Sequence, residues 1–319
     1  MRGMVQGEVL FRDVKVGPEA LLGAGERGLE VGVDSMSWSR FAIAATCVGS
    51  MKRCVQLATR FAGRRSIATG RVLEHPVIRT YLGESAARIA GIDLLLRKVA
   101  EKIDAGEGVA AEIFAACKLA GSEFLWRTAD SLVQILGSRG YDEANEAPQI
   151  LRDARVTRIF EGPSEPLQAF LGAAALAPTS DLQAFLRDDL DGTARADALR
   201  EAVTALRARS AGVPAGAAGA RRAWECAVAG RAAMWALTCA AAEQALRRGT
   251  LLEGDLAAAW LAARFERACA AVRAPAPDEL AMIEPATVEK LVEAYGGAIG
   301  DVEQHLPGGR EERDPLLRR

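Results

Sequence analysis

The segment from Leu151 to Gly172 reads LRDARVTRIFEGPSEPLQAFLG, and it places the carboxylate of Glu161 at a break between a basic segment and an apolar helix start. Gly162 and Pro163 follow, residues that interrupt helices and let a backbone come close to a ligand. Three arginines upstream supply fixed charge. This setting suits a general base, and the alternative is a solvated glutamate in an ordinary loop.

Apolar residues recur at helical spacing on both sides of this segment. They predict helices over about Leu29–Ala62, Pro76–Ala105 and Val109–Leu136, with a shorter fourth helix after Gly162. A glycine turn at Gly137 and a loop would connect the third and fourth helices. Four helices with short connections indicate a bundle, which we assign to residues 23–178.

Residues 179–319 predict a second helical domain. We expect an amphipathic helix over 181–207, a mobile Gly/Ala/Pro linker near 208–220, two Ala-rich helices within 221–273, and a further helix over Pro285–Tyr295. The tail from residue 308 should be loosely ordered. The side chains expected to anchor this extension on the bundle are Trp224, Trp235 and Trp260.

The N-terminal residues favour a strand from Gly7 to Val16, because valine, leucine and phenylalanine alternate there with polar residues. One strand cannot form a sheet alone, because its backbone groups need partners. Gly23–Gly28 matches G-x-G-x-x-G formally. We reject a dinucleotide-binding fold, because Pro18 intervenes and no acid lies between Phe41 and Met51.

Composition narrows the class of protein. The 319 residues are 50% hydrophobic and 5% aromatic with a formal net charge of -2, which gives no support for nucleic-acid binding. Six cysteines lack C-x2-C pairs and predict buried free thiols in a reducing compartment. Only two histidines are present, so no metal site is expected. Without an apolar run of about 20 residues, we expect no transmembrane segment and a cytoplasmic protein.

Two motifs occur in order: Gln134-Ile-Leu-Gly-Ser-Arg-Gly-Tyr141, then Arg152-Asp153 leading to Ile159-Phe-Glu-Gly162. Together they resemble the C-terminal domain of acyl-CoA dehydrogenases, in which QI(L/M)GG-x-G(F/Y) precedes RD and I-(Y/F)-EGT at nearly this spacing. The resemblance runs from about residue 7 to 175, and the extension resembles the very-long-chain subfamily. It implies an all-α fold, a four-helix bundle of this type followed by a second helical domain, with a residual N-terminal strand. It further implies that residues 1–22 are the remnant of the family's middle β-domain.

The resemblance also implies roles for individual residues. Glu161 corresponds to the catalytic base, and the acyl thioester cleft would include Arg40, Phe160 and Gly162. The expected contacts to FAD are Arg65 at the pyrophosphate, Gln134, Gly137 and Ser138 at the adenosine end of a flavin bound mainly to a neighbouring subunit, and Glu165. Ser138 replaces a usual glycine, and Pro163 replaces a threonine that contacts the flavin, so we expect weaker flavin binding.

The implied activity is FAD-dependent α,β-dehydrogenation of an acyl-CoA or carrier-protein thioester in fatty acid metabolism. The family's N-terminal helical domain and β-barrel are not in this sequence. We therefore expect a homodimer, or a heteromer with a chain that carries those domains, unless this is a shortened product of a longer gene. An electron-transferring flavoprotein or oxygen would accept the electrons. The alternatives are a non-catalytic helical subunit of a complete dehydrogenase and a scaffold whose extension binds a membrane surface.

Overall fold

The computed structural model describes residues 7–23, 28–210, 218–250, 254–274 and 283–299. Residues 1–274 form one compact unit and residues 275–319 a second, so the units separate at residue 275 and not at residue 179. In the second unit, α11 (Pro285–Ile299) confirms the predicted helix there. None of the described helices combines the length and the hydrophobicity of a transmembrane span.

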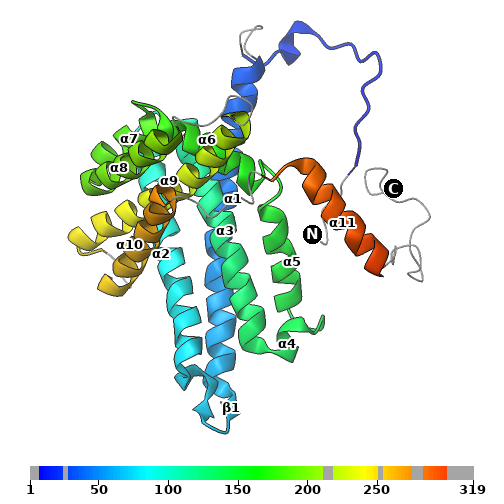
Figure 1. Cartoon of the computed structure of the whole chain (residues 1–319), viewed down its shortest axis with the longest axis vertical. Helices are drawn as coiled ribbons and strands as arrows, with labels where there is room; N and C mark the ends of the chain where they lie inside the picture. Colours follow the sequence, from blue (N-terminus) through cyan, green and yellow to red (C-terminus); the bar gives the residue numbers. More distant parts are fainter. Residues whose placement is uncertain (1–6, 24–27, 211–217, 251–253, 275–282, 300–319) are drawn as a thin grey trace. The chain divides into compact units, whose positions relative to one another are not determined.

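Three long helices run side by side in the first unit (Figure 1). They are α1 (Gly28–Arg64), α2 (Pro76–Asp104) and α3 (Ala111–Leu136), each within two residues of its predicted bounds. Small side chains let α1 and α3 approach closely: a Cβ on Gly121 would lie 3.0 Å from Cα of Ala44. The core between them includes the fully buried Cys47 and Cys117. All six cysteines are free and buried, as predicted.

The connection between α3 and the base segment differs from the predicted loop. It contains a short helix α4 (Ser138–Tyr141) and the helix α5 (Ala147–Thr157), which packs on α3. Pro148 suits the first turn of α5, where no N–H is needed. The helix buries Ala147, Pro148 and Ala154, and this small apolar face was too weak a periodic signal. The predicted fourth helix is α6 (Ser164–Leu176).

The one predicted strand is absent, and a short strand pair that was not predicted is present. Gly7–Val16 is exposed and forms no strand, because no neighbouring strand among the described residues supplies ladder hydrogen bonds. A short 3-10 helix η1 (Pro18–Ala20) follows it. A small hairpin that the sequence analysis missed joins α1 to α2: β1 (Ser66–Ile67) pairs antiparallel with β2 (Gly70–Arg71), and η2 (Val72–Glu74) leads into α2.

The predicted helix over 181–207 is interrupted. It divides into α7 (Asp181–Ala184), the π-helical turn η3 (Phe185–Asp189) and α8 (Thr193–Ser210). Asp191 has φ 50°, and a Cβ on Gly192 would lie 2.8 Å from the carbonyl oxygen of Leu186. The chain therefore turns sharply at Asp191–Gly192, which helical periodicity alone did not predict.

Two Ala-rich helices follow, as predicted: α9 (Ala218–Arg247) and α10 (Gly254–Arg273). Residues 208–210 and 218–220 of the expected linker are helical, and its remainder, 211–217, lies outside the described residues, as does the C-terminal tail. The helix α9 crosses α6 with backbones in contact: a Cβ on Gly230 would overlap the carbonyl of Gln168, and one on Gly172 would overlap that of Cys226. Glycine is therefore required at this crossing.

The three tryptophans expected to anchor the extension are half-buried against the main core, and two of them, Trp235 and Trp260, contact identified residues of the bundle. The Trp235 ring lies 5.0 Å from the Phe124 ring of α3, centroid to centroid. On α10, Nε1 of Trp260 donates to Glu84 of α2 (3.4 Å), and Arg264 pairs with the same carboxylate at 2.6 Å. Trp224 is half-buried, and the cation near its ring, Arg221, belongs to its own helix.

Candidate active site

The segment between α5 and α6 has an unusual backbone. Glu161 has φ 54° and Gly162 has φ 93°. Positive φ is uncommon for a residue with a side chain and costs on the order of 1–3 kcal/mol, so it persists only where surrounding contacts hold it. The contacts that hold this segment therefore define the site.

Two cations hold the two carbonyl groups of this segment. Nε of Arg40, on α1, donates to the Glu161 carbonyl at 3.3 Å, and Nζ of Lys118, on α3, donates to the Gly162 carbonyl at 2.7 Å. Burial lowers the pKa of Arg40 from its ordinary value, although the charge of Glu161 opposes this shift. Burial also lowers the pKa of Lys118 to about 8. Because their hydrogen bonds are charge-assisted, these two cations are strong restraints on the backbone.

The ends of the segment are tied to each other and to α3. The Ser164 N–H donates to the Arg158 carbonyl at 3.1 Å. One oxygen of Glu123 on α3 accepts from Nε of Arg158 and from the Ser164 hydroxyl, each at 2.6 Å. The Arg158 guanidinium also lies 6.0 Å from the Trp126 ring centroid. The segment is thus a closed loop on the surface of α3, which we call the base loop (residues 158–164).

The chemically active groups of the base loop are left without partners. Among the described residues, the half-buried Glu161 carboxylate makes no hydrogen bond or ion pair, and the N–H groups of Glu161 and Gly162 have no acceptor. The loop is therefore held through its carbonyls, while its acid and its donors remain available to a bound molecule.

The predicted base and substrate residues meet at this loop. Arg40 contacts it, Phe160 is half-buried within it, and a Cβ on Gly162 would lie 3.7 Å from Nη2 of Arg40. Glu165 is exposed in the first turn of α6, immediately after the loop. We call this region the base end of the bundle.

The other predicted flavin residues lie at the opposite end, where the hairpin joins α1 to α2 (Figure 1). Arg65 follows α1 directly, and the Arg139 guanidinium lies 5.9 Å from the ring centroid of Phe61, one turn before it. This contact brings the Gly137 turn to the same end. Arg65, Gln134, Gly137 and Ser138 are all exposed there. We call this region the hairpin end.

The two ends are far apart. Arg40 and Arg65 are 25 residues apart along α1 and its C-terminal cap. At about 1.5 Å per residue, that places them roughly 38 Å apart along the helix axis. An extended dinucleotide is shorter than this, so one flavin does not contact both arginines of one chain.

Lys118 and Glu123, which hold the base loop from α3, were not predicted from the sequence. A signal for Lys118 was present: it is the only charged residue from Ile113 to Ser122. A lone cation in such a run is either buried with a partner or at a surface break in the helix. Its partner is a carbonyl 44 residues later, which the local sequence does not indicate.

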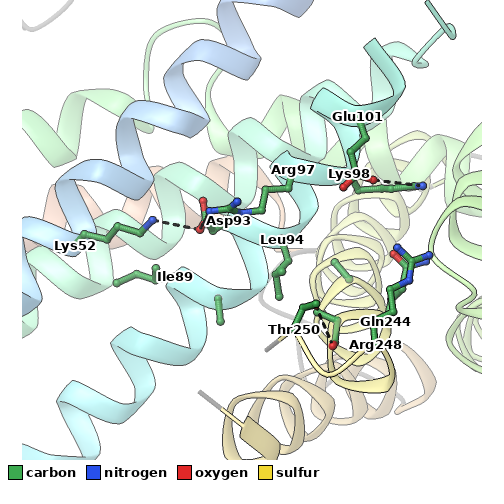
Figure 2. A pocket seen from close by; sticks show the side chains of 13 residues that line it. Lys52, Ile89, Asp93, Leu94, Arg97, Lys98, Glu101, Gln244, Arg248 and Thr250 are labelled. Atoms are coloured by element: carbon green, nitrogen blue, oxygen red, sulfur yellow. Dashed lines mark hydrogen bonds and ion pairs between the residues drawn. The ribbon is translucent and has the colours of Figure 1, made fainter. Parts of the chain in front are cut away.

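Among the cavities that border these helices, two bear on the candidate site. One of about 540 Å³, shown in Figure 2, lies between α1, α2 and the C-terminal end of α9, and Lys52 and Asp93 form an ion pair at 3.2 Å beside it. It contains none of the predicted site residues. A second, of about 390 Å³, is lined by the first turns of α1 and by Val109, Ala111 and Phe114. Within the described ranges, no three His, Cys, Asp or Glu side chains are placed to hold a metal ion.

Residues 26–176 match the family of the acyl-CoA dehydrogenase C-terminal domain. Cyclohex-1-ene-1-carbonyl-CoA dehydrogenase of Geobacter metallireducens is 28% identical over 179 residues, 56% of this chain and 47% of that protein. The very long-chain specific acyl-CoA dehydrogenase of Rattus norvegicus is 32% identical over 168 residues, 51% of this chain and 25% of that protein. The chain thus spans less than half the length of these curated relatives.

A solved structure extends the likeness in fold beyond the bundle. The acyl-CoA dehydrogenase complexed with FAD from Bacillus anthracis aligns with 92% of this chain and 56% of its own, with a TM-score of 0.63 and 19% identity. At this identity the likeness concerns the fold, and it confirms the predicted all-α class. With the motifs at both ends of the bundle, these findings show that residues 26–176 of this chain belong to the acyl-CoA dehydrogenase C-terminal domain family.

Proposed function

We propose that this chain takes part in FAD-dependent α,β-dehydrogenation of an acyl thioester and that Glu161 is the catalytic base. The observation that supports this proposal is the base loop. Its backbone is held through the Glu161 and Gly162 carbonyls, whereas the Glu161 carboxylate has no partner among the described residues. A base needs such a fixed backbone and an accessible carboxylate.

The base loop has the groups that the proton transfer requires. The Glu161 N–H, which has no acceptor in the described part of the chain, would donate to the thioester carbonyl and make the α-hydrogen more acidic. The Glu161 carboxylate would then take the α-proton as the Cα–Cβ double bond forms. Bound FAD supplies the acceptor for the β-hydride, and an electron-transferring flavoprotein or oxygen would reoxidise it.

We assign the acyl chain to the 390 Å³ cavity beside the first turns of α1. Its apolar lining includes Leu29, Val33 and Phe114. The Phe114 ring lies 6.3 Å from that of Phe41, the neighbour of Arg40, centroid to centroid. An apolar chain starting at the base loop would therefore find apolar surface along α1.

The hairpin end fits a dinucleotide. Arg65 is exposed, and no atom lies within 4 Å of a Cβ placed on Gly137, so a ligand backbone can approach both. Because the two ends are about 38 Å apart, the proposed flavin at one base loop would contact the hairpin end of a second copy. This favours a homodimer or a heteromer with a chain that carries a flavin-covering β-domain. This chain alone should bind FAD weakly, because it supplies only pyrophosphate and adenosine contacts.

The test is Glu161→Gln, with Glu101→Gln, an exposed glutamate on α2 outside the proposed site, as the control. The full chain is loaded with FAD, together with a β-domain polypeptide if it retains no flavin alone, and anaerobic bleaching of the flavin by an acyl-CoA is measured. Glu161→Gln should keep its flavin and bleach at least about 10³-fold more slowly, because no base takes the proton. Glu101→Gln should bleach at nearly the wild-type rate.

Two outcomes would contradict the proposal. Unchanged bleaching in Glu161→Gln would exclude this residue as the base. Wild-type protein that binds no flavin under any of these conditions, yet assembles with a complete dehydrogenase, would identify the non-catalytic subunit instead.

A further inference from the structure

Lys118 is a cation enclosed by the bundle core. It is 0% exposed and is the largest of the fully buried side chains, and its neighbours Cys117 and Leu119 are also fully buried. A buried ammonium is expensive unless it is well paired, and hydrophobic residues of similar volume often replace buried charges without loss of stability. Its presence therefore needs a reason other than the packing of α3.

Its hydrogen-bond acceptor is the Gly162 carbonyl, at 2.7 Å. This carbonyl belongs to the Gly162–Pro163 peptide, the peptide unit that the sequence of the base loop itself restrains least. Glycine rotates freely about its backbone, and Pro163, the next residue, has no N–H that could fix the same peptide plane from its other side. The tie between Ser164 and Arg158 closes the loop but does not set this orientation.

We propose that Lys118 is a positioning residue: its buried ammonium fixes the Gly162 peptide plane and thereby the direction of the Glu161 side chain. This inference rests on the proposed function only in naming Glu161 as the base. Arg40 holds the preceding carbonyl from α1, so the left-handed pair Glu161–Gly162 is held from two helices. Rotation of either peptide would move the carboxylate by more than a reaction geometry tolerates.

The charge of Lys118 makes this restraint depend on pH. The groups that face it are Cys47 and Arg40 from α1, Glu123 from its own helix, and Glu161 from the loop. Burial is the dominant influence and lowers the pKa of Lys118 from 10.5 to about 8. Below that pH the ammonium donates a charge-assisted hydrogen bond, and above it a neutral amine donates a weaker one. The base loop should therefore loosen as the pH rises through about 8.

The test uses Lys118→Met, which keeps the length of the side chain without its charge, and Lys52→Met, a surface lysine, as control. Hydrogen exchange of the peptide covering residues 158–164 is measured in the full chain and corrected for intrinsic rates. We expect at least about ten-fold faster exchange in Lys118→Met, with α2 and the hairpin unchanged. In wild type, protection of this peptide should fall between pH 7 and 9.5, and in Lys118→Met it should not.

The FAD-loaded protein gives a second readout. Lys118→Met should lower kcat by roughly 10- to 100-fold with little change in KM, because substrate binding surfaces remain while the base is misdirected. Wild-type protection of the loop in Lys118→Met would overturn the proposal even if Glu161→Gln abolishes turnover. Faster exchange in Lys118→Met, together with unchanged turnover in Glu161→Gln, would support the positioning role of Lys118 and reject Glu161 as the base. If Lys118→Met does not fold, unchanged protection of the wild-type loop from pH 7 to 9.5 overturns the inference.

Discussion

The base end and the hairpin end of the bundle share helices but have opposite physical character. At the base end, the cations Arg40, Lys118 and Arg158 are wholly or partly buried, each donates to a backbone carbonyl or a carboxylate, and two residues hold positive φ. At the hairpin end, Arg65 and Ser138 are exposed, and the Gly137 turn is open to solvent. One end is organised before any ligand arrives, whereas the other presents its groups to one.

This difference indicates a division of tasks. Proton abstraction requires a carboxylate fixed within about 0.5 Å of its productive position, so its support must be internal and rigid. Contacts to a dinucleotide's phosphates tolerate more freedom, because an arginine fork can follow its anion. Changes at the hairpin end should therefore lower the affinity for the dinucleotide, whereas changes at the base end should lower the rate of proton abstraction, each independently of the other.

The largest effect is expected where α9 supports the base end. In Gly230→Ala, the added methyl group would overlap the Gln168 carbonyl and push α6 and α9 apart. The displaced α6 carries Leu167, whose Cδ2 lies 3.2 Å from a Cβ placed on Gly162. We expect a loss of about 3 kcal/mol in the free energy of unfolding, as for overpacked cores. Urea denaturation measures the loss. Relative to wild type, the hydrogen exchange rate in Gly230→Ala should increase more in the base loop than at the hairpin.

Gly219→Ala is the matched control, because it lies in the same helix and no atom is within 4 Å of its Cβ position. It should be neutral or slightly stabilising, since alanine favours helix. Equal stabilities of the two variants would show that α6 and α9 are not in backbone contact. An equal increase in hydrogen exchange at the base end and the hairpin end would show that α9 does not support the base end in particular.

At the hairpin end, Arg65→Ala should weaken FAD binding by roughly ten- to a hundred-fold, the value of about 1.5–3 kcal/mol for a charge-assisted contact. Fluorescence titration of FAD measures this. Arg64→Ala, an exposed neighbour, is the control and should bind FAD nearly as wild type does. Turnover of Arg65→Ala at saturating FAD should remain close to wild type. Comparable losses from both arginines would indicate general attraction of anions and no specific site.

The smallest effect concerns stability and pH. The folded-state pKa of Lys118 is lowered to about 8, against an ordinary value of 10.5. Between these values the unfolded chain binds a proton that the folded chain has released, so this group makes stability rise with pH there, by at most about 1.4 kcal/mol per pH unit. The stability of wild type relative to Lys118→Met should therefore increase from pH 8 to 9.5 in urea titrations. Parallel curves of stability against pH for wild type and Lys118→Met would show that a group other than Lys118 titrates in this range.

Sequence patterns predicted the long helices well because their ends have local causes. Pro76 begins α2, and the left-handed Gly137 ends α3. The short helix α5 escaped because its buried face consists of alanines and a proline between arginines. The strand at Gly7–Val16 was wrong because alternation describes one side of a pairing, and the other side must be present for a strand to form.

The candidate site, like the fold, was predictable from the sequence only in part. The resemblance to the acyl-CoA dehydrogenase family implied that Arg40, Glu161 and Gly162 form one group, and Arg40 contacts the loop. The direct restraints from α3 were not predictable from local sequence, because Lys118 and Glu123 act on residues 35 to 44 positions away. Which buried cation reaches which carbonyl is decided by how the helices cross, and periodicity does not report that.

The buried cysteines have a practical consequence. Burial raises the pKa of Cys47 and Cys269 to about 11 and that of Cys54, Cys117 and Cys239 to about 12, so these thiols remain protonated and unreactive near neutral pH. All six native cysteines are enclosed by side chains. A single cysteine introduced on the exposed hairpin, for example at Ile67, would therefore be the one fast-reacting thiol of the described chain. Spectroscopic probes can thus be attached to the natural sequence without first removing its own cysteines.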